Sequence, residues 1–143
     1  MLIMARKMLE ENNFCVLSTC SNDLPNSSLM HYIYDDISMS IFMLTLSGSV
    51  KYNNITANPR VSLLIDTRAN VLQTGRTVMA LTVFGTAEIV KDPQRHQTLV
   101  DQLVAKYGSL AKLASDSQCQ VIQVKIEKML LLDGVSSNST IDI

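Results

Sequence analysis

The sequence has little of what marks the common nucleotide-binding folds. Its 143 residues contain only five glycines, three prolines and no tryptophan. The glycines are scattered, so the chain has neither the GxGxxG turn of a Rossmann fold nor the GK[ST] ending of a P-loop. A nucleophile-elbow glycine pattern is also missing, and nothing in the sequence specifically supports nucleophilic catalysis. These absences exclude the most easily recognised NTPase, dehydrogenase and hydrolase signatures.

The chain also has few cysteines and a net charge close to zero. Cys15, Cys20 and Cys119 are odd in number and lack CxxC spacing, which argues against a disulfide framework or a zinc site and favours a reducing compartment. Twelve basic and thirteen acidic residues give a net charge of −1. Because nucleic-acid partners usually require a clustered basic excess, we expect no nucleic-acid binding. No metal site is predicted.

Long hydrophobic runs are the third absence. No apolar stretch approaches the ~18 residues of a membrane-spanning helix, and Arg6, Lys7, Glu10 and Glu11 interrupt the apolar N-terminus too early for a signal sequence. We therefore expect a cytoplasmic protein without a membrane partner. A length of 143 residues with 47% hydrophobic residues predicts a single domain over 1–143, with a polar tail at 135–143 that frays.

The pattern of apolar residues predicts a mainly β protein. Helical spacing is found in two or three short segments, at 2–11, 50–57 and from Pro93 to a stop at Gly108. About six strands are predicted, at 14–19, 28–34, 38–44, 60–66, 78–90 and 118–132, with a loop at 67–75. Gly85 inside the long fifth strand indicates a bulge. Short connections favour an antiparallel β-barrel over a parallel βαβ sheet.

One polar interruption lies between two apolar strands. Ser49 is predicted to cap the helix at 50–57, so the free N–H groups of its first turn would lie beside Thr45, Ser47 and Lys51. Such a group of donors suits a phosphate. The same residues are also typical of a plain turn and cap with Lys51 in solvent. The local sequence leaves both interpretations open.

The chain resembles the flavin-binding split β-barrels related to pyridoxamine 5′-phosphate oxidase. The most specific similarity is the segment FMLTLSGSVKYNNITANPRVSLLID, and VFGTAEIVKD and VIQVKIEKMLLLDG give weaker support. The similarity extends from residue 14 to about residue 134. It implies an FMN-binding split barrel, usually a homodimer with the flavin at the subunit interface. The apolar segment 78–90 is predicted to contribute to that interface.

The resemblance also implies positions for the cofactor. The residues expected to bind the FMN phosphate are Thr45, Ser49 and Lys51. Those expected to line the isoalloxazine ring are Ser28, Leu29, Met30 and His31. His31 can be a hydrogen-bond donor to the flavin or a structural histidine at a strand edge.

Two departures from the family pattern narrow the function. Val50 stands where the oxidases tend to have arginine, which removes one charge-assisted contact. The chain also ends in SSNSTIDI, without the basic and histidine residues with which the oxidases hold pyridoxamine phosphate. We therefore expect a general flavin-binding member, a reductase or oxidase of an unidentified small molecule, rather than the vitamin B6 oxidase. The alternatives are another cofactor, such as a deazaflavin or haem, or a non-catalytic flavin-binding module.

Overall fold

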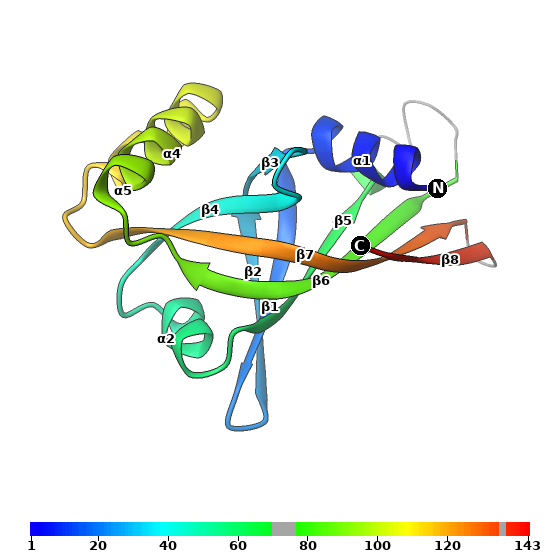
Figure 1. Ribbon diagram of the computed structural model, residues 1–143, viewed down its shortest axis with the longest axis horizontal. Coiled ribbons are helices and arrows are strands. Elements are labelled where there is room, and N and C mark those ends of the chain that lie inside the picture. The colour runs from blue at the N-terminus through cyan, green and yellow to red at the C-terminus, as the bar shows by residue number, and fades with distance from the viewer. Residues whose placement is uncertain (70–76, 135–136) are drawn as a thin grey trace.

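The computed structural model describes residues 1–69, 77–134 and 137–143, shown in Figure 1. The strands are β1 (Phe14–Ser21), β2 (Leu24–His31), β3 (Ile33–Asp35), β4 (Ser40–Leu46), β5 (Arg60–Asp66), β6 (Met79–Ile89), β7 (Cys119–Asp133) and β8 (Ser137–Asp142). The helices are α1 (Leu2–Glu11), α2 (Val50–Ala57), α4 (Pro93–Lys106), the 3₁₀ turn η1 (Gly108–Leu110) and α5 (Ala111–Ala114).

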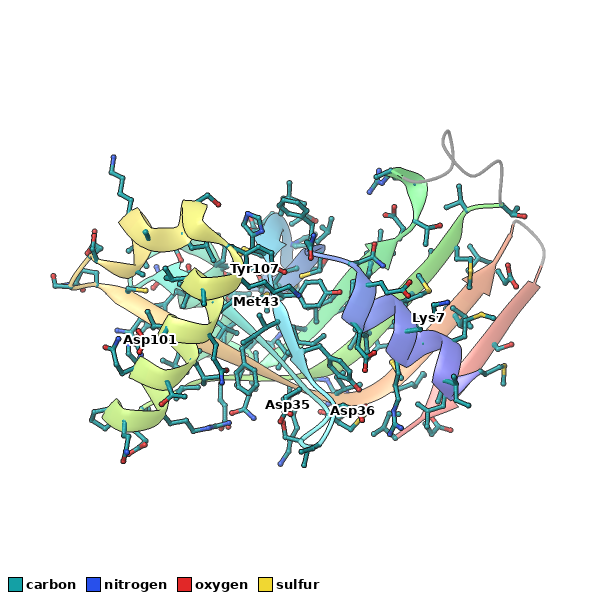
Figure 2. All side chains as sticks on the ribbon, turned by 90° about the horizontal axis from the view of Figure 1, so that it is seen from above. Lys7, Asp35, Asp36, Met43, Asp101 and Tyr107 are labelled. Carbon is teal, nitrogen blue, oxygen red and sulfur yellow. The ribbon has the colours of Figure 1, made fainter. Side chains whose placement is uncertain are left out.

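All strand pairs are antiparallel and form one eight-stranded sheet. The order is β2-β1-β5-β6-β7-β4-β3, and β8 pairs with β7. The views in Figures 1 and 2 place α1 toward one end of the sheet and α4 with α5 toward the other. This mainly antiparallel half-barrel confirms the predicted fold class. Eight strands occur where the sequence predicts about six, because β3 and β8 were not predicted as separate strands.

The main core is a row of apolar side chains that crosses four strands. The register pairs Leu17 with Leu63, Leu63 with Val83, and Val83 with Met129. Each of these four side chains is at most 1% exposed. Directly paired residues lie on the same face of a sheet, so period-two alternation in each strand produces this row. Ala5, Met8 and Leu9 of α1 belong to the same core.

Strand β4 is apolar without alternation because both of its faces are covered. Ile41 and Met43 belong to the main core, whereas Phe42 and Leu44 pack in a second cluster that includes Leu103 of α4. A strand buried on both faces reads as a continuous apolar run. The second cluster packs α4 against β4, the strand that carries Thr45.

The hairpin turn, the strand break and the bulge of the sheet each have an identifiable cause. Asn22 and Asp23 have φ values of 53° and 61°, as a tight two-residue hairpin turn requires, so β2 begins at Leu24 rather than near residue 28. The predicted strand 28–34 is interrupted at Tyr32, whose buried hydroxyl donates to the carbonyl of Leu9 over 2.7 Å. The predicted bulge is confirmed: the β6–β7 register shifts between Phe84 and Gly85.

The C-terminal prediction differs from the structure. Ser137–Asp142 forms β8, which pairs with the second half of β7, in place of a frayed tail. A polar sequence can form an edge strand because its backbone hydrogen bonds do not depend on apolar side chains. The predicted loop at 67–75 lies mostly outside the described residues. None of the helices in the described ranges is long and apolar enough to cross a membrane.

Candidate functional site

The turn before α2 has the predicted capping geometry. Ser49 is the N-cap, with extended backbone angles, and its Oγ accepts the N–H of Tyr52 over 3.3 Å. Gly48 has φ of +84°, a left-handed conformation that glycine adopts without strain. The Ser49 N–H donates to the carbonyl of Leu46 over 3.2 Å. The predicted helix 50–57 is therefore confirmed together with its cap.

Two hydroxyl groups and one ammonium group gather at this turn. Thr45 is 3% exposed, and its Oγ1 lies 2.8 Å from Ser49 Oγ. Lys51 is half-buried on the first turn of α2. No ion pair found within residues 1–69, 77–134 and 137–143 involves Lys51. An ammonium group beside two hydroxyls and a helix N-terminus suits an anionic group.

A cavity of about 320 Å³ connects this turn to β2. Its lining comes from β2, β4, the turn, α2, η1 and α5, and comprises Leu29, Met30, His31, Leu44, Thr45, Leu46, Ser49, Lys51, Leu110 and Leu113. Six of the seven predicted cofactor residues are therefore together in one cavity. Its walls are mostly apolar, and its hydroxyl and ammonium groups come from one side.

Ser28 is the predicted residue that does not line this cavity. It lies further along β2, opposite Leu17, and its Oγ accepts a hydrogen bond from Asn26 Nδ2 over 3.3 Å. Consecutive strand residues are about 3.3 Å apart, so the cavity reaches only the last residues of β2. The structure therefore separates Ser28 from the other candidates.

His31 is held by aromatic packing. Its ring centroid lies 4.2 Å from that of Phe14 and 4.4 Å from that of Tyr107. Its Nδ1 is buried and has no hydrogen-bond partner among the described residues. Both interpretations of His31 remain compatible with this position, since the ring is packed on its sides and still lines the cavity.

Tyr107 packs against one side of the His31 ring. Its hydroxyl donates to the carbonyl of Tyr32 over 2.6 Å, and burial raises its pKa to about 12. The group is therefore a neutral hydrogen-bond donor at physiological pH. Figure 2 labels Tyr107 at the end of α4, beside Met43 in that view.

Four lining residues were not predicted: Leu44, Leu46, Leu110 and Leu113. Leu110 and Leu113 come from η1 and α5, far from Thr45 in the sequence, and form part of the apolar wall. Their spacing of three residues is typical of one helix face, and this was the available signal. Assigning them to the cavity required the position of α5 relative to β4.

The thiols do not add reactive chemistry to this site. Burial raises the pKa of the Cys15 thiol to about 12, and its Sγ lies 3.8 Å from Met43 Sδ. A buried thiol with a high pKa behaves as a small apolar residue. None of the three cysteines is disulfide-bonded.

The cavity therefore suits a ligand with a broad apolar part and an anionic end. The apolar part would lie along Leu29, Met30 and the leucines, and the anionic end at Thr45, Ser49 and Lys51. His31 and Lys51 are its titratable lining residues. Such a lining binds and orients a ligand, and the reactive chemistry would come from that ligand.

Comparison with known proteins gives both a family and a fold. A family model described as pyridoxamine 5′-phosphate oxidase matches residues 3–133. A Schizosaccharomyces pombe protein described as a pyridoxamine 5′-phosphate oxidase homolog is 37% identical over 68 residues, which is 42% of this chain. The matched part spans only 36% of that relative.

Solved structures share the architecture at low sequence identity. An FAD-binding protein from Mesorhizobium loti has a TM-score of 0.76 and 20% identity, and the match covers 92% of this chain and 93% of the other. A heme binding protein from Mycobacterium smegmatis has a TM-score of 0.80 and 14% identity, with 96% of this chain and 56% of the other covered. These likenesses describe the fold.

Proposed function

Since the chain belongs to the pyridoxamine 5′-phosphate oxidase family, we propose that it is an FMN-binding redox protein, a flavin-dependent reductase or oxidase of a small molecule. The observation that carries this proposal is the cavity that unites six of the predicted cofactor residues. Its apolar walls match a flavin ring, and its donor end matches a phosphate. Bound FMN would supply the electron and hydride chemistry.

The residues of this chain would hold and orient the cofactor. Thr45, Ser49 and Lys51 would bind the phosphate, and Leu29, Met30 and His31 would lie along the ring. Val50 is 61% exposed and does not line the cavity. The positive charge at this turn therefore comes from Lys51, and a general flavin-binding role fits this reduced charge better than the vitamin B6 oxidase.

Haem is the second candidate cofactor. One of the similar structures is a heme binding protein, and an imidazole such as that of His31 is a common ligand of haem iron. A deazaflavin would use the same apolar walls and anion site as FMN. A non-catalytic flavin-binding module would use the same residues without turnover.

Titration of the purified protein with FMN and with haem tests the proposal. We expect FMN to show a perturbed flavin absorbance spectrum and quenched fluorescence at one site per chain. Consumption of NADH or NADPH faster than by free FMN would identify an enzyme rather than a binding module. Tight haem binding with a shifted Soret band and no flavin binding would overturn the flavin proposal.

We also propose that the protein is a homodimer with the flavin at the interface. Leu29, Val16, Leu64, Thr82 and Leu130 are paired in register across five strands on the face opposite the main core. Leu29 is 71% exposed and also lines the candidate cavity. A second copy that covered this row would therefore also cover the ring end of the cavity.

Segment 78–90 offers fewer apolar side chains to this interface than its composition indicates. Leu81, Val83 and Ala87 are buried inside one chain, and only Val78 and Phe84 among its large apolar residues are markedly exposed. The proposed interface therefore depends on several strands, with β6 contributing Thr82 and Phe84.

Replacing Leu64 by lysine is expected to yield a monomer. Leu64 lies at the centre of the exposed row and is 36% exposed, so the lysine would be tolerated by the single chain but would carry a charge into the apolar interface. Analytical ultracentrifugation at micromolar concentration measures the mass. Ile37→Lys is the control, because Ile37 is 96% exposed at a turn outside the row. A monomeric wild type would contradict the proposal.

A further inference from the structure

The His31 ring is held by contacts from two separate elements. Its direct strand partner is Phe14 at the start of β1, and their ring centroids lie 4.2 Å apart. The second ring is that of Tyr107, the C-cap residue of α4 (Figure 2), with a centroid distance of 4.4 Å. Packing of this kind restrains the rotation of the imidazole ring, while His31 still lines the candidate cavity.

Tyr107 is itself fixed by buried hydrogen bonds. Its hydroxyl donates to the carbonyl of Tyr32 over 2.6 Å, and the hydroxyl of Tyr32 donates to the carbonyl of Leu9 in α1 over 2.7 Å. Tyr107 is 8% exposed and Tyr32 is 0% exposed. The backbone N–H of Tyr107 donates to the carbonyl of Leu103 over 2.8 Å. The ring beside His31 is therefore anchored at its hydroxyl and at its backbone, and the same hydroxyl holds the backbone directly after His31.

The burial of His31 Nδ1 indicates which ring nitrogen carries the proton. A neutral imidazole has one N–H donor and one unprotonated acceptor nitrogen. Nδ1 is buried and has no hydrogen-bond partner within residues 1–69, 77–134 and 137–143. A buried N–H without an acceptor is rarer than a buried acceptor without a donor, so we expect the proton at Nε2. The donor that His31 offers to a ligand is then the Nε2–H group.

We propose that Tyr107 is a positioning residue that orients His31 to donate from Nε2 to the ring of a bound flavin, and that this donor increases the preference of the site for reduced flavin. The inference rests on the proposed function and deepens it. Thr45, Ser49 and Lys51 are the other side-chain donors among the lining residues, and they are assigned to the phosphate. His31 is therefore the side-chain donor left for the ring. A flavin ring carries more negative charge when it is reduced, so a hydrogen bond donated to it becomes stronger.

Anaerobic titration with oxidised FMN and with dithionite-reduced FMN tests this assignment. We expect His31→Leu to lower the ratio of reduced to oxidised affinity about tenfold, which corresponds to a fall of about 30 mV in the two-electron midpoint potential of the bound flavin. His31→Gln should restore most of the ratio, because its amide supplies an N–H donor. Tyr107→Phe should lower the ratio about threefold, since the ring stays but loses its anchor. His96→Leu is the matched control, because His96 does not line the cavity.

Nitrogen NMR shifts of His31 in the apoprotein give a readout that does not depend on a cofactor. At a pH where the imidazole is neutral, we expect a protonated Nε2 and an unprotonated Nδ1 in the wild type. Tyr107→Phe should show a mixture of the two tautomers. A proton at Nδ1 in the wild type would overturn the assignment.

The outcomes separate this assignment from the proposed function. Wild-type protein that binds FMN, with an unchanged affinity ratio in His31→Leu, would make His31 a structural histidine and leave the flavin proposal standing. Failure of the wild type to bind FMN, FAD and riboflavin would overturn both. A lowered ratio in His31→Leu and Tyr107→Phe, restored in His31→Gln and unchanged in His96→Leu, would support the assignment.

Discussion

The Gly85→Ala variant is expected to lose about 3 kcal/mol or more of its free energy of unfolding. A Cβ at this position would lie 2.3 Å from the backbone oxygen of Lys125 and 2.9 Å from Val124 Cγ1. A backbone atom cannot move aside as a flexible side chain can, so the bulge between β6 and β7 would have to open. Opening it would disturb the longest strand pair of the sheet.

Thermal or urea unfolding measures this effect. For a domain of this size, a loss of 3 kcal/mol corresponds to a fall in Tm of about 6–12 °C. Gly108→Ala is the control, since a Cβ at Gly108 would have no heavy atom within 4 Å, and its effect should stay within about 0.5 kcal/mol. Equal stability of the two variants would show that β6 and β7 are not closely packed at the bulge.

The Lys51→Ala variant is expected to bind FMN ten- to a hundredfold more weakly than wild type. The substitution removes a charge-assisted contact to the phosphate worth ~1.5–3 kcal/mol. Thr45 and Ser49 would remain, but both are neutral hydroxyls already 2.8 Å from each other. Riboflavin lacks the phosphate, so its affinity should barely change. Fluorescence titration with the two flavins in parallel measures the difference.

The loss in Lys51→Ala should belong to binding and not to folding. Lys51 is half-buried, and none of the ion pairs found in the described part of the chain includes it. The unfolding midpoint of the apoprotein is therefore expected to stay unchanged, and Lys51→Arg should restore most of the FMN affinity. Unchanged FMN affinity in Lys51→Ala would mean that the segment from Ser47 to Lys51 is a plain turn and helix cap.

Several elements could be predicted from sequence because their signals are local. The helices at 2–11 and 50–57 and the strand at 60–66 have the predicted bounds, since amphipathic spacing, the Ser49 cap and Pro59 act within a few residues. The Gly85 bulge was predicted for the same reason. The division of residues 24–35 into two strands was not, because it depends on the hydrogen bond between Tyr32 and distant Leu9.

In the candidate site, too, local features could be predicted from the sequence and long-range ones could not. A resemblance in one continuous segment was enough to predict Thr45, Ser49 and Lys51, because the turn and helix cap that hold them lie within that segment. The end of β2 was predicted as the ring-lining strand, but the sequence did not show that the cavity excludes Ser28. Strand register and the depth of a cavity depend on neighbouring strands, and these are separated in the sequence.

The sequence by itself determined the mainly β class, the polar turn with its cap, and the family to which the chain belongs. Those properties depend on residue types at short spacing. The backbone preferences that produce them come from residues that are close together in the sequence. Only the tertiary structure decided that Leu110 and Leu113 form a wall of the cavity. Their position depends on the packing of α4 against Phe42 and Leu44, a long-range contact that burial of apolar surface stabilises and that no local pattern specifies.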